Sequence, residues 1–350
     1  ENAKSDWDSY ETSWDFQSLP LLTASSDPTP TLESSYTAWT RENRDTIAEM
    51  KRLEEENNRL FIDAYGLADE LTPDVPIEQI TLTVNPAYRY GGKLTEEEQW
   101  TRFRQDTMEE LVSYAIGCMM GRYSLDAPGL IYAHSGNEGF DPSRYTTFPA
   151  DHDAIIPILE GNWFTDDIVE RLKEFLKVTF GTENYEENLR YLEDGLYPSN
   201  LEGKKRKTIR EYFLKEFYNN HVQTYKKRPI YWLFSSPKGS FNALIYLHRY
   251  RSDTVSTVLN DYLREFKTKL RARLDNEQTL AADAGASKSD KTKALKETER
   301  LKKMLTELED WEREVLYPLA AEKLEIDLDD GVKHNYPLFG KALKKIAGLS

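Results

Sequence analysis

The sequence predicts a mainly α-helical protein with a small β-hairpin and strand insert, an α+β fold built from a helical body and a long antiparallel helical hairpin. Apolar residues recur at helical spacing through most of the chain after Thr40. Two runs of β-branched and aromatic residues within residues 229–250 flank a Ser-Pro-Lys-Gly turn, which is typical of a β-hairpin. Beyond Ser252, two charged helical stretches are separated by Ala-Gly-Ala-Ser at 284–287, which predicts the helical hairpin.

The composition is that of a folded chain long enough for two domains. Its 350 residues are 39% apolar and 31% charged, with 21 Tyr and 7 Trp, unlike aromatic-poor disordered sequences. Prolines at positions 20, 28 and 30 oppose regular structure near the start. We therefore expect a connector docking on a neighbouring domain (1–36), a helical body with the β-hairpin at 229–250 (37–252), the antiparallel helical hairpin (253–326) and a C-terminal tail (327–350).

The helical body is predicted to begin with a long charged helix. This helix runs from Thr40 to a stop at Gly66, because glycine readily takes the left-handed conformation that ends helices. Thr95 and Glu98 form a capping box for a second, mostly buried helix. Between the two, residues 71–92 predict a strand-and-loop insert. The strand of this insert is expected at 80–84. After the second helix, we expect a loop section at 124–163 and further helices at 165–181, about 183–195 and about 207–225.

The cysteine content and the hydropathy of the sequence indicate the cellular compartment of the protein. Cys118 is the only cysteine, so the chain cannot form an intramolecular disulfide. No apolar run approaches the length needed to cross a bilayer, and the first residues are too polar and acidic for a signal or transit peptide. These features indicate a cytoplasmic protein with no membrane partner.

The net charge of −15 is unfavourable for a DNA-binding protein, because neutralisation of phosphates by Lys and Arg supplies much of the affinity. The charge is unevenly distributed, however. Residues 203–273 hold 17 Lys and Arg against 5 Asp and Glu, a local balance of +12 that leaves −27 for the rest of the chain. Either this basic stretch contacts phosphates, or it forms solvated helix faces that pack against acidic neighbours.

If the β-hairpin and the helices around it pack side by side, the cations of the basic stretch form a band. Such a band can contact several phosphates of double-stranded DNA. It sets affinity, whereas reading a base sequence requires Arg, amide or Tyr side chains in a groove. The candidate DNA-binding residues are Lys204, Lys205, Arg206, Lys207, Arg210, Lys226, Lys227, Arg228, Lys238, Arg249 and Arg251.

The sequence predicts no catalytic residue, no metal site and no cofactor in this chain. Residues 85–88, Asn-Pro-Ala-Tyr, resemble the Asn-Pro-Pro-Tyr motif of adenine methyltransferases, but no Gly-rich turn between a strand and a helix precedes them to bind S-adenosylmethionine. A Pro-containing turn is the favoured interpretation. The five histidines are scattered, so none pairs with another at metal-ligand spacing. Asp151, His152 and Asp153 form the one compact acid–imidazole cluster, without a nucleophile signature.

Long aromatic-rich segments of the chain are similar to a known family. They are Asp6–Phe16, Asn58–Leu67, Ser113–Asp126, Lys227–Ser236 with Tyr246–Tyr250, and Asp327–Lys333. In these segments the chain resembles the C-terminal region of PglX, the adenine-specific DNA methyltransferase family of BREX phage-defence systems. The resemblance extends over nearly the whole chain.

The resemblance implies N6-methylation of adenine in a short non-palindromic DNA site, with S-adenosylmethionine as donor. The mark labels host DNA as self in phage defence. The family's cofactor motif and its Asn-Pro-Pro-Tyr motif lie in an N-terminal methyltransferase domain, so no catalytic residue is carried over onto this sequence. The C-terminal region is then expected to hold DNA beside that domain, with other BREX subunits as further partners.

Two hypotheses of different classes follow. In the first, residues 200–275 clamp DNA for the attached methyltransferase domain and carry no chemistry by themselves. In the second, the fragment is a protein–protein assembly module whose helical hairpin and acidic N-terminal half dock other BREX subunits. The +12 balance of the basic stretch favours the first hypothesis, and the −27 balance elsewhere favours the second.

Overall fold

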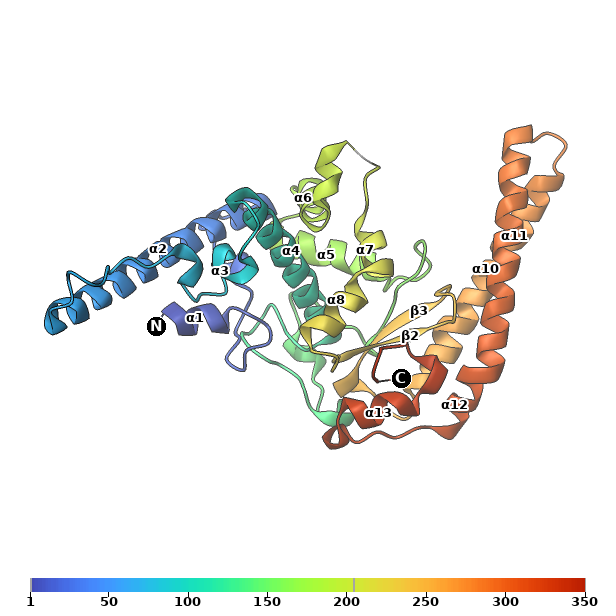
Figure 1. Cartoon of the computed structure of the whole chain (residues 1–350). Helices are drawn as coiled ribbons and strands as arrows, with labels where there is room; N and C mark the ends of the chain where they lie inside the picture. Colours follow the sequence, from blue (N-terminus) through green and yellow to red (C-terminus); the bar gives the residue numbers. More distant parts are fainter. Residues whose placement is uncertain (1, 204, 350) are drawn as a thin grey trace. The chain divides into compact units, whose positions relative to one another are not determined.

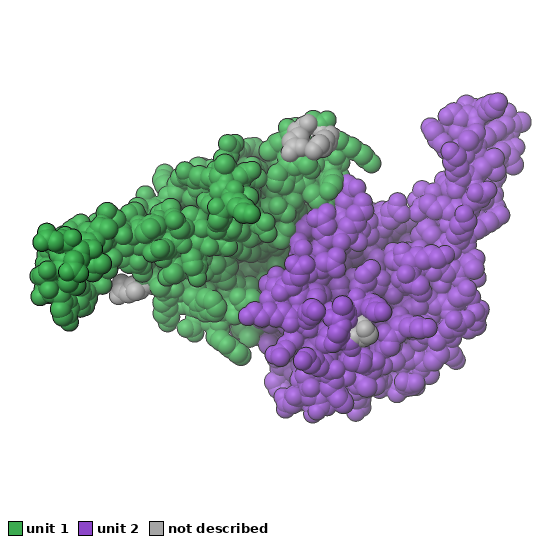
Figure 2. All heavy atoms as spheres, in the orientation of Figure 1, with its two compact units in different colours: residues 1–117, 125–130, 172–209 green, residues 118–124, 131–171, 210–350 purple. Residues whose placement is uncertain are grey.

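The computed structural model describes residues 2–203 and 205–349, which form two compact units (Figures 1 and 2). Unit 1 holds the chain up to Gly117 together with residues 125–130 and 172–209. Unit 2 holds residues 118–124 and 131–171 and the chain from Arg210 onward. The described chain is 60% helical with a small antiparallel sheet, which confirms the predicted fold class.

Unit 1 begins its long helices with α2 (Leu32–Tyr65), which starts earlier than predicted and ends where predicted. The Thr31 side chain accepts a hydrogen bond from the backbone N–H of Ser34, and the Ser34 side chain accepts one from Thr31 in return, so a capping box sets the start. Gly66 follows with φ 66°, a left-handed conformation that ends the helix. The Gly66 stop is therefore confirmed.

The core of unit 1 forms around α4 (Glu96–Met120), the helix predicted from its capping box. The Thr95 backbone N–H donates to the Glu98 carboxylate at 2.8 Å, and the Glu98 N–H donates to Thr95 Oγ1 at 3.3 Å. Helices α5 (Ile168–Phe180) and α6 (Tyr185–Leu196) supply further core residues. The Tyr114 and Phe175 rings meet edge to face at 6.3 Å. Gly195 of α6 lies so near α4 that a Cβ there would stand 2.5 Å from Met108 Cγ.

The strand predicted at Ile80–Val84 is wrong, because the segment finds another partner for its backbone. Ile80, Leu82 and Val84 are buried alternately as in a strand, yet the segment forms turns between η2 (Ile77–Gln79) and α3 (Pro86–Tyr90). The Asp6 carboxylate accepts the N–H groups of Thr83 at 2.7 Å and Val84 at 2.9 Å. A side chain thus satisfies N–H groups that a neighbouring strand would otherwise bind.

The first segment of the chain packs within unit 1. Besides Asp6, its Phe16 is buried against Tyr114 at 6.0 Å, and Glu11 accepts a hydrogen bond from the Ser113 hydroxyl at 2.7 Å. The docking of residues 1–36 on another domain stays a prediction. The short helices of this unit are α1 (Asn2–Asp8), η1 (Pro20–Leu22) and η5 (Pro198–Glu202).

Unit 2 contains a three-stranded antiparallel sheet in the order β1-β3-β2. Strands β2 (Tyr231–Ser235) and β3 (Asn242–Tyr246) form the predicted β-hairpin, with Tyr231 opposite Tyr246. Strand β1 (Ile155–Pro157), which lies in the predicted loop section, pairs with β3 and was not predicted. All residues of the three strands are buried. The outer edge of β2 receives the C-terminal segment, where the Lys344 N–H donates to the Leu233 carbonyl at 2.8 Å.

The helical hairpin of unit 2 is formed by α10 (Arg264–Ala282) and α11 (Lys288–Trp311), which run side by side and reach away from the sheet (Figure 1). Ion pairs join the arms, with Arg264 on Glu312 and Arg273 on Glu297, in the antiparallel sense. The apolar residues at helical spacing along both arms are all buried: Leu259, Leu263, Phe266, Leu270, Leu301, Leu305, Leu308 and Leu316. The predicted hairpin is confirmed.

Shorter helices complete unit 2. The single helix predicted at 207–225 is wrong, because it is interrupted at Glu216 into α7 (Ile209–Lys215) and α8 (Phe217–Thr224). Among the described residues, no helix has both the length and the apolar character to cross a bilayer. The remaining helices are η3 (Ser135–Asn137), η4 (Pro142–Arg144), η6 (Leu247–Arg249), α9 (Thr254–Thr257), the π-helical η7 (Val258–Leu263) and η8 (Glu312–Leu316), α12 (Tyr317–Glu322), η9 (Leu328–Asp330), α13 (Val332–Leu338) and η10 (Gly340–Ala342).

Candidate nucleic-acid interface

Arg249 was predicted to contact DNA, but it lies in the core of unit 2 with 3% of its surface exposed. Its guanidinium donates to the backbone carbonyls of Asp151 at 2.7 Å and His152 at 2.9 Å, and to the Asn137 side chain at 2.8 Å. It also stacks on the Phe140 ring at 3.7 Å. Burial lowers the pKa of Arg249. A guanidinium with these partners holds chain segments together and cannot reach a phosphate, so we leave it out of the DNA surface.

Arg210 and Arg206 are likewise used inside their own units. In unit 2, Arg210 makes a two-pronged ion pair with the buried Asp167 carboxylate at 2.8 and 2.9 Å, and donates to two backbone carbonyls. In unit 1, Arg206 binds Glu193 at 3.2 Å and Asp194 at 2.5 Å. The basic stretch is thus partly neutralised by acidic neighbours, as the alternative interpretation of its charge anticipated.

The candidates Lys204, Lys205, Lys207 and Arg251 differ in how exposed their side chains are and in whether they form ion pairs. Lys204 lies outside the described residues. Lys205 is exposed, and exposed Lys207 lies over the Tyr197 ring at 4.6 Å. Arg251 is exposed but pairs with Asp253 at 3.1 Å. Exposed surface pairs of this kind hold each other weakly, so a phosphate can compete for such a cation.

The turn between α8 and β2 presents three cations together. Lys226, Lys227 and Arg228 are all exposed, and none has a carboxylate partner among the described residues. Lys226 and Lys227 have φ angles of 50° and 62°, in the left-handed region that side chains with a Cβ disfavour by about 1–2 kcal/mol per residue. Backbone hydrogen bonds from Lys227 to Val222 and from Arg228 to Tyr225, both 2.8 Å, hold the turn. The two left-handed residues directly follow the end of α8, where this conformation commonly ends a helix.

Lys238, at the tip of the β-hairpin, is exposed and held in place through its backbone. Its N–H donates to the carboxylate of Glu307 on α11 at 2.6 Å, and the Ser240 hydroxyl donates to the same carboxylate. The Lys238 ammonium group itself has no partner among the described residues. Since β2 separates Lys238 from the turn at 226–228, the two lie at opposite ends of the hairpin.

Three lysines that the sequence analysis did not select lie near Lys238. Lys302 and Lys303 of α11 and Lys341 of η10 line the same pocket as Lys238. Only the fold brings them there, because 38 or more positions separate Lys341 from the other three. The adjacent pair Lys302-Lys303 was a visible signal, but its position on a helical hairpin does not say which surface it faces.

The segment Asn85-Pro86-Ala87-Tyr88 caps a helix. Asn85 is buried, and its side-chain oxygen Oδ1 accepts a hydrogen bond from the Ala87 N–H at 3.2 Å. Its side-chain nitrogen Nδ2 donates to the backbone carbonyls of Ile77 at 2.7 Å and Ile80 at 2.9 Å. The buried side-chain amide is thus engaged at both its oxygen and its nitrogen in holding the local backbone, which favours a structural role for Asn85. The favoured interpretation of a Pro-containing turn agrees with this geometry.

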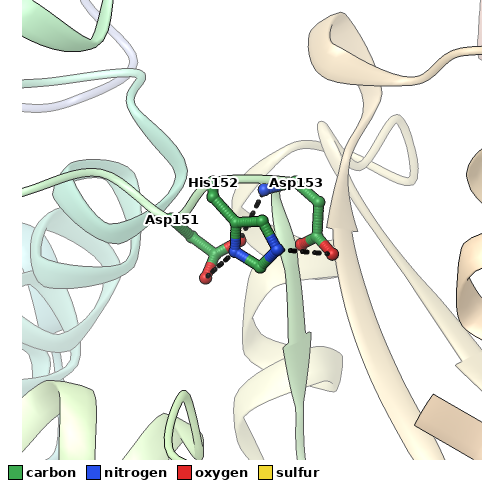
Figure 3. A group of neighbouring side chains, drawn as sticks. All are labelled: Asp151, His152 and Asp153. Atoms are coloured by element: carbon green, nitrogen blue, oxygen red, sulfur yellow. Dashed lines mark hydrogen bonds and ion pairs between the residues drawn. The ribbon is translucent and has the colours of Figure 1, made fainter. Parts of the chain in front are cut away.

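Asp151, His152 and Asp153 lie before β1, with the exposed imidazole between the two carboxylates (Figure 3). His152 Nε2 is 3.4 Å from Asp153 Oδ2 and Nδ1 is 4.0 Å from Asp151 Oδ2. Burial raises the pKa of Asp151 to about 7, and both the charge of Asp153 and the hydrogen bond between the two carboxyl groups contribute to this rise. Asp151 Oδ1 accepts the N–H groups of residues 153, 154 and 155, which ties this carboxylate to the turn that starts the strand.

The sheet of unit 2 differs from the parallel sheets at which α/β proteins bind nucleotide cofactors. An α/β cofactor site lies at the carboxyl ends of parallel strands, where a Gly-rich turn leads into a helix. The sheet described for this chain has three strands, all antiparallel, and β2 and β3 are joined by the Lys238 loop. Within the described residues the sheet therefore offers no such crevice.

Comparison with known proteins identifies relatives of the whole chain. The chain is 37% identical over 361 aligned positions to the adenine-specific methyltransferase BrxX of Escherichia coli O9:H4 (strain HS), covering 100% of this chain and 29% of that protein. It is 35% identical over 345 positions to the adenine-specific methyltransferase PglX of Lacticaseibacillus casei (strain Zhang), covering 96% of this chain and 26% of that protein. No protein-family model matches the chain.

The chain thus spans less than a third of the length of either relative. Identity above one third over such a length establishes common ancestry of the matched regions, and the resemblance inferred from the sequence is confirmed. This chain is a homologue, along its whole length, of one region of the BREX adenine-specific methyltransferases BrxX and PglX.

Proposed function

We propose that this region grips double-stranded DNA for an adenine-specific methyltransferase and carries no chemistry of its own. A methyltransferase that acts on a base in a duplex must turn that base out of the stack, which costs a few kcal/mol. Contacts to the phosphate backbone away from the reacting base offset this cost and fix the enzyme's position on the DNA. A region that supplies such contacts needs exposed cations and no catalytic group.

The turn at 226–228 carries this proposal. Lys226, Lys227 and Arg228 are exposed, lack acidic partners among the described residues, and stand on a backbone that holds two lysines in the left-handed region. A turn with only a structural task would be expected to use Gly or Asn at such angles. Lys205, Lys207, Lys238 and Arg251 add exposed cations, while Arg206, Arg210 and Arg249 serve the fold.

The proposed division of labour places the reaction outside this chain. S-adenosylmethionine and the catalytic residues belong, in this proposal, to the N-terminal methyltransferase domain of the longer protein. The occupied amide of Asn85 and the antiparallel sheet support this division. Double-stranded DNA and the methyltransferase domain are the proposed partners.

Charge reversal at the turn tests the proposal. The variant Lys226→Glu, Lys227→Glu, Arg228→Glu of the 350-residue chain should bind duplex DNA at least about tenfold more weakly at low salt, because three phosphate contacts become repulsive. The control carries the same charge change at three exposed lysines of unit 1, Lys4→Glu, Lys93→Glu, Lys177→Glu. Fluorescence anisotropy with a labelled duplex measures both. Equal losses in the two variants would contradict a specific role for the turn.

An exposed apolar cluster favours a second function, assembly with other BREX subunits. Near the end of α2, Leu60, Phe61 and Tyr65 have 65%, 57% and 73% of their surfaces exposed. Large apolar side chains grouped on one exposed helix end often mark a protein–protein contact. This observation concerns unit 1 and is compatible with DNA binding by unit 2.

The variant Leu60→Ser, Phe61→Ser tests the second function. This variant should no longer co-purify with the other BREX subunits. The temperature at which the variant unfolds should be unchanged, because both side chains are already exposed to water. The matched control is Leu201→Ser, Leu338→Ser, which removes two exposed leucines that lie outside both α2 and the helical hairpin. Complex formation by the α2 variant equal to that of the unmodified chain would exclude docking through α2.

A further inference from the structure

A second basic site lies at the tip of the β-hairpin, in unit 2. A pocket of about 700 Å³ is bounded by the hairpin tip, one face of α11 and the segment of η10. Each of these elements contributes lysine: Lys238 comes from the hairpin tip, Lys302 and Lys303 from α11, and Lys341 from η10. We call this site the lysine pocket.

The acidic residues of the lysine pocket are already engaged by other groups. Glu307 is buried and accepts hydrogen bonds from the Lys238 backbone and the Ser240 hydroxyl. Asp310 and Glu314 both bind Arg313, at 2.6 and 2.9 Å. The four lysine ammonium groups are exposed and have no ion-pair or hydrogen-bond partner within the described ranges.

The backbone around the lysine pocket is fixed from several sides. The Trp311 indole N–H donates to the Lys341 carbonyl at 3.2 Å, which ties η10 to α11. Residues just after Lys341 pair with β2, with Leu343 bridged to Phe234. Glu307 ties α11 to the hairpin tip. The four lysines are therefore carried by a rigid frame, which limits the ordering cost of binding.

The lining of the pocket carries four lysine charges against the three carboxylates of Glu307, Asp310 and Glu314, which is a net charge of +1. Arg313, which both Asp310 and Glu314 bind, adds one further positive charge beside the pocket. A phosphate that binds the exposed lysine ammonium groups releases its own counterions. Lysine suits a phosphate oxygen as a compact point charge with three rotatable donors.

We propose that the lysine pocket binds backbone phosphates of double-stranded DNA and forms a second contact in addition to the turn at 226–228. The inference rests on the proposed function, since it names a further site for the same partner. It extends the DNA surface to α11 and to the C-terminal segment, which lie outside the basic stretch counted at 203–273. The two contacts are separated by the length of β2 and so engage different phosphates.

The variant Lys302→Gln, Lys303→Gln, Lys341→Gln of the full 350-residue chain tests the lysine pocket. Its affinity for a labelled duplex should fall at least about tenfold at 100 mM salt. The slope of log affinity against log salt should become shallower by about 2–3, because each lost phosphate contact removes about 0.9. The control Lys4→Gln, Lys93→Gln, Lys177→Gln removes three exposed lysines of unit 1 and should leave affinity and slope unchanged.

Thermal unfolding of both variants checks that the fold is intact. An unchanged DNA affinity and slope in the lysine-pocket variant would overturn the inference while leaving the proposed function standing. If the unmodified chain bound no DNA, the proposed function would fail as well. A variant that lost binding of inorganic phosphate or of polyglutamate but kept DNA affinity would also overturn the inference, in favour of a small anion or an acidic protein.

Discussion

Arg249 joins three segments of unit 2 at the end of β3, through the carbonyls of Asp151 and His152 and the side chain of Asn137. A count of charged residues in the sequence cannot distinguish Arg249 from Lys227, because both carry one positive charge. The difference lies in the donors: a guanidinium offers five N–H groups in a plane and can satisfy several buried carbonyls at once. In this chain's basic stretch, Arg210 and Arg249 are accordingly drawn into the fold, while Arg228 stays exposed like Lys227.

Replacing Arg249 by methionine should destabilise unit 2 by about 2–4 kcal/mol. Methionine keeps the apolar stem but leaves the buried carbonyl of Asp151 and the part-buried carbonyl of His152 without this donor. Urea unfolding measures the change, with Arg251→Met as matched control, since Arg251 is exposed and its side chain pairs with the exposed Asp253. The control should shift stability by less than about 0.5 kcal/mol. Equal effects at both positions would contradict the structural role of Arg249.

His221 makes stability depend on pH. Burial, helped by the charge of Arg122, lowers the pKa of His221 to about 3, and its Nε2 accepts the Tyr231 N–H at 3.1 Å. The pKa of His248 is lowered to about 4 by the same two causes, burial and the charge of Arg122. Both must stay neutral in the folded state, so the unfolded chain binds more protons below its histidine pKa of about 6.5. Their stabilising contribution is complete above pH 6.5 and is lost as pH falls toward 4.

Urea unfolding between pH 7 and pH 5 should therefore show stability decreasing by up to about 1.4 kcal/mol per pH unit for each of the two histidines. The variant His221→Gln, which cannot take up a proton, should flatten this slope by one histidine's share. A slope that is the same in the variant and the unmodified chain would show that His221 does not titrate on unfolding.

At the scale of elements, helix ends were predictable where local side chains set them. Thr95 with Glu98 and the glycine at position 66 act within one turn of backbone, so their sequence pattern suffices. The buried leucines of the helical hairpin were predictable for a related reason, since their spacing follows the helix period.

Elements that depend on distant partners were not predictable. The run at Ile80–Val84 has strand chemistry, but the carboxylate of Asp6, 77 residues away from Thr83, takes the place of a neighbouring strand. The reverse happens at Ile155–Pro157, a three-residue segment that becomes a strand only because β3 is beside it. In both places the tertiary partner overrides local propensity.

The candidate site shows the same division. Lys226, Lys227, Arg228 and Lys238 were found from local charge and turn signals, and the structure leaves them exposed. Which of the arginines would be buried could not be predicted, because acidic and carbonyl partners such as Asp167 come from other elements. Lys302 and Lys341 meet only when α11 and η10 lie against the hairpin tip.

At the scale of the whole molecule, a chain of net charge −15 can still bind DNA if its cations gather and its acids are engaged elsewhere. In unit 2 the turn at 226–228 and the lysine pocket are such gatherings. The homology to under a third of BrxX and PglX agrees with a region that contributes contacts to a larger enzyme. Whether these contacts are made through phosphates is the central question.

The salt dependence of duplex DNA binding by the unmodified 350-residue chain answers it most directly. Each neutralised phosphate contributes about 0.9 to the negative slope of log affinity against log salt. With the turn and the lysine pocket both engaged, we expect a slope of about −4 or steeper between about 50 and 200 mM salt. Absence of binding at about 50 mM salt, or a slope near zero, would contradict it.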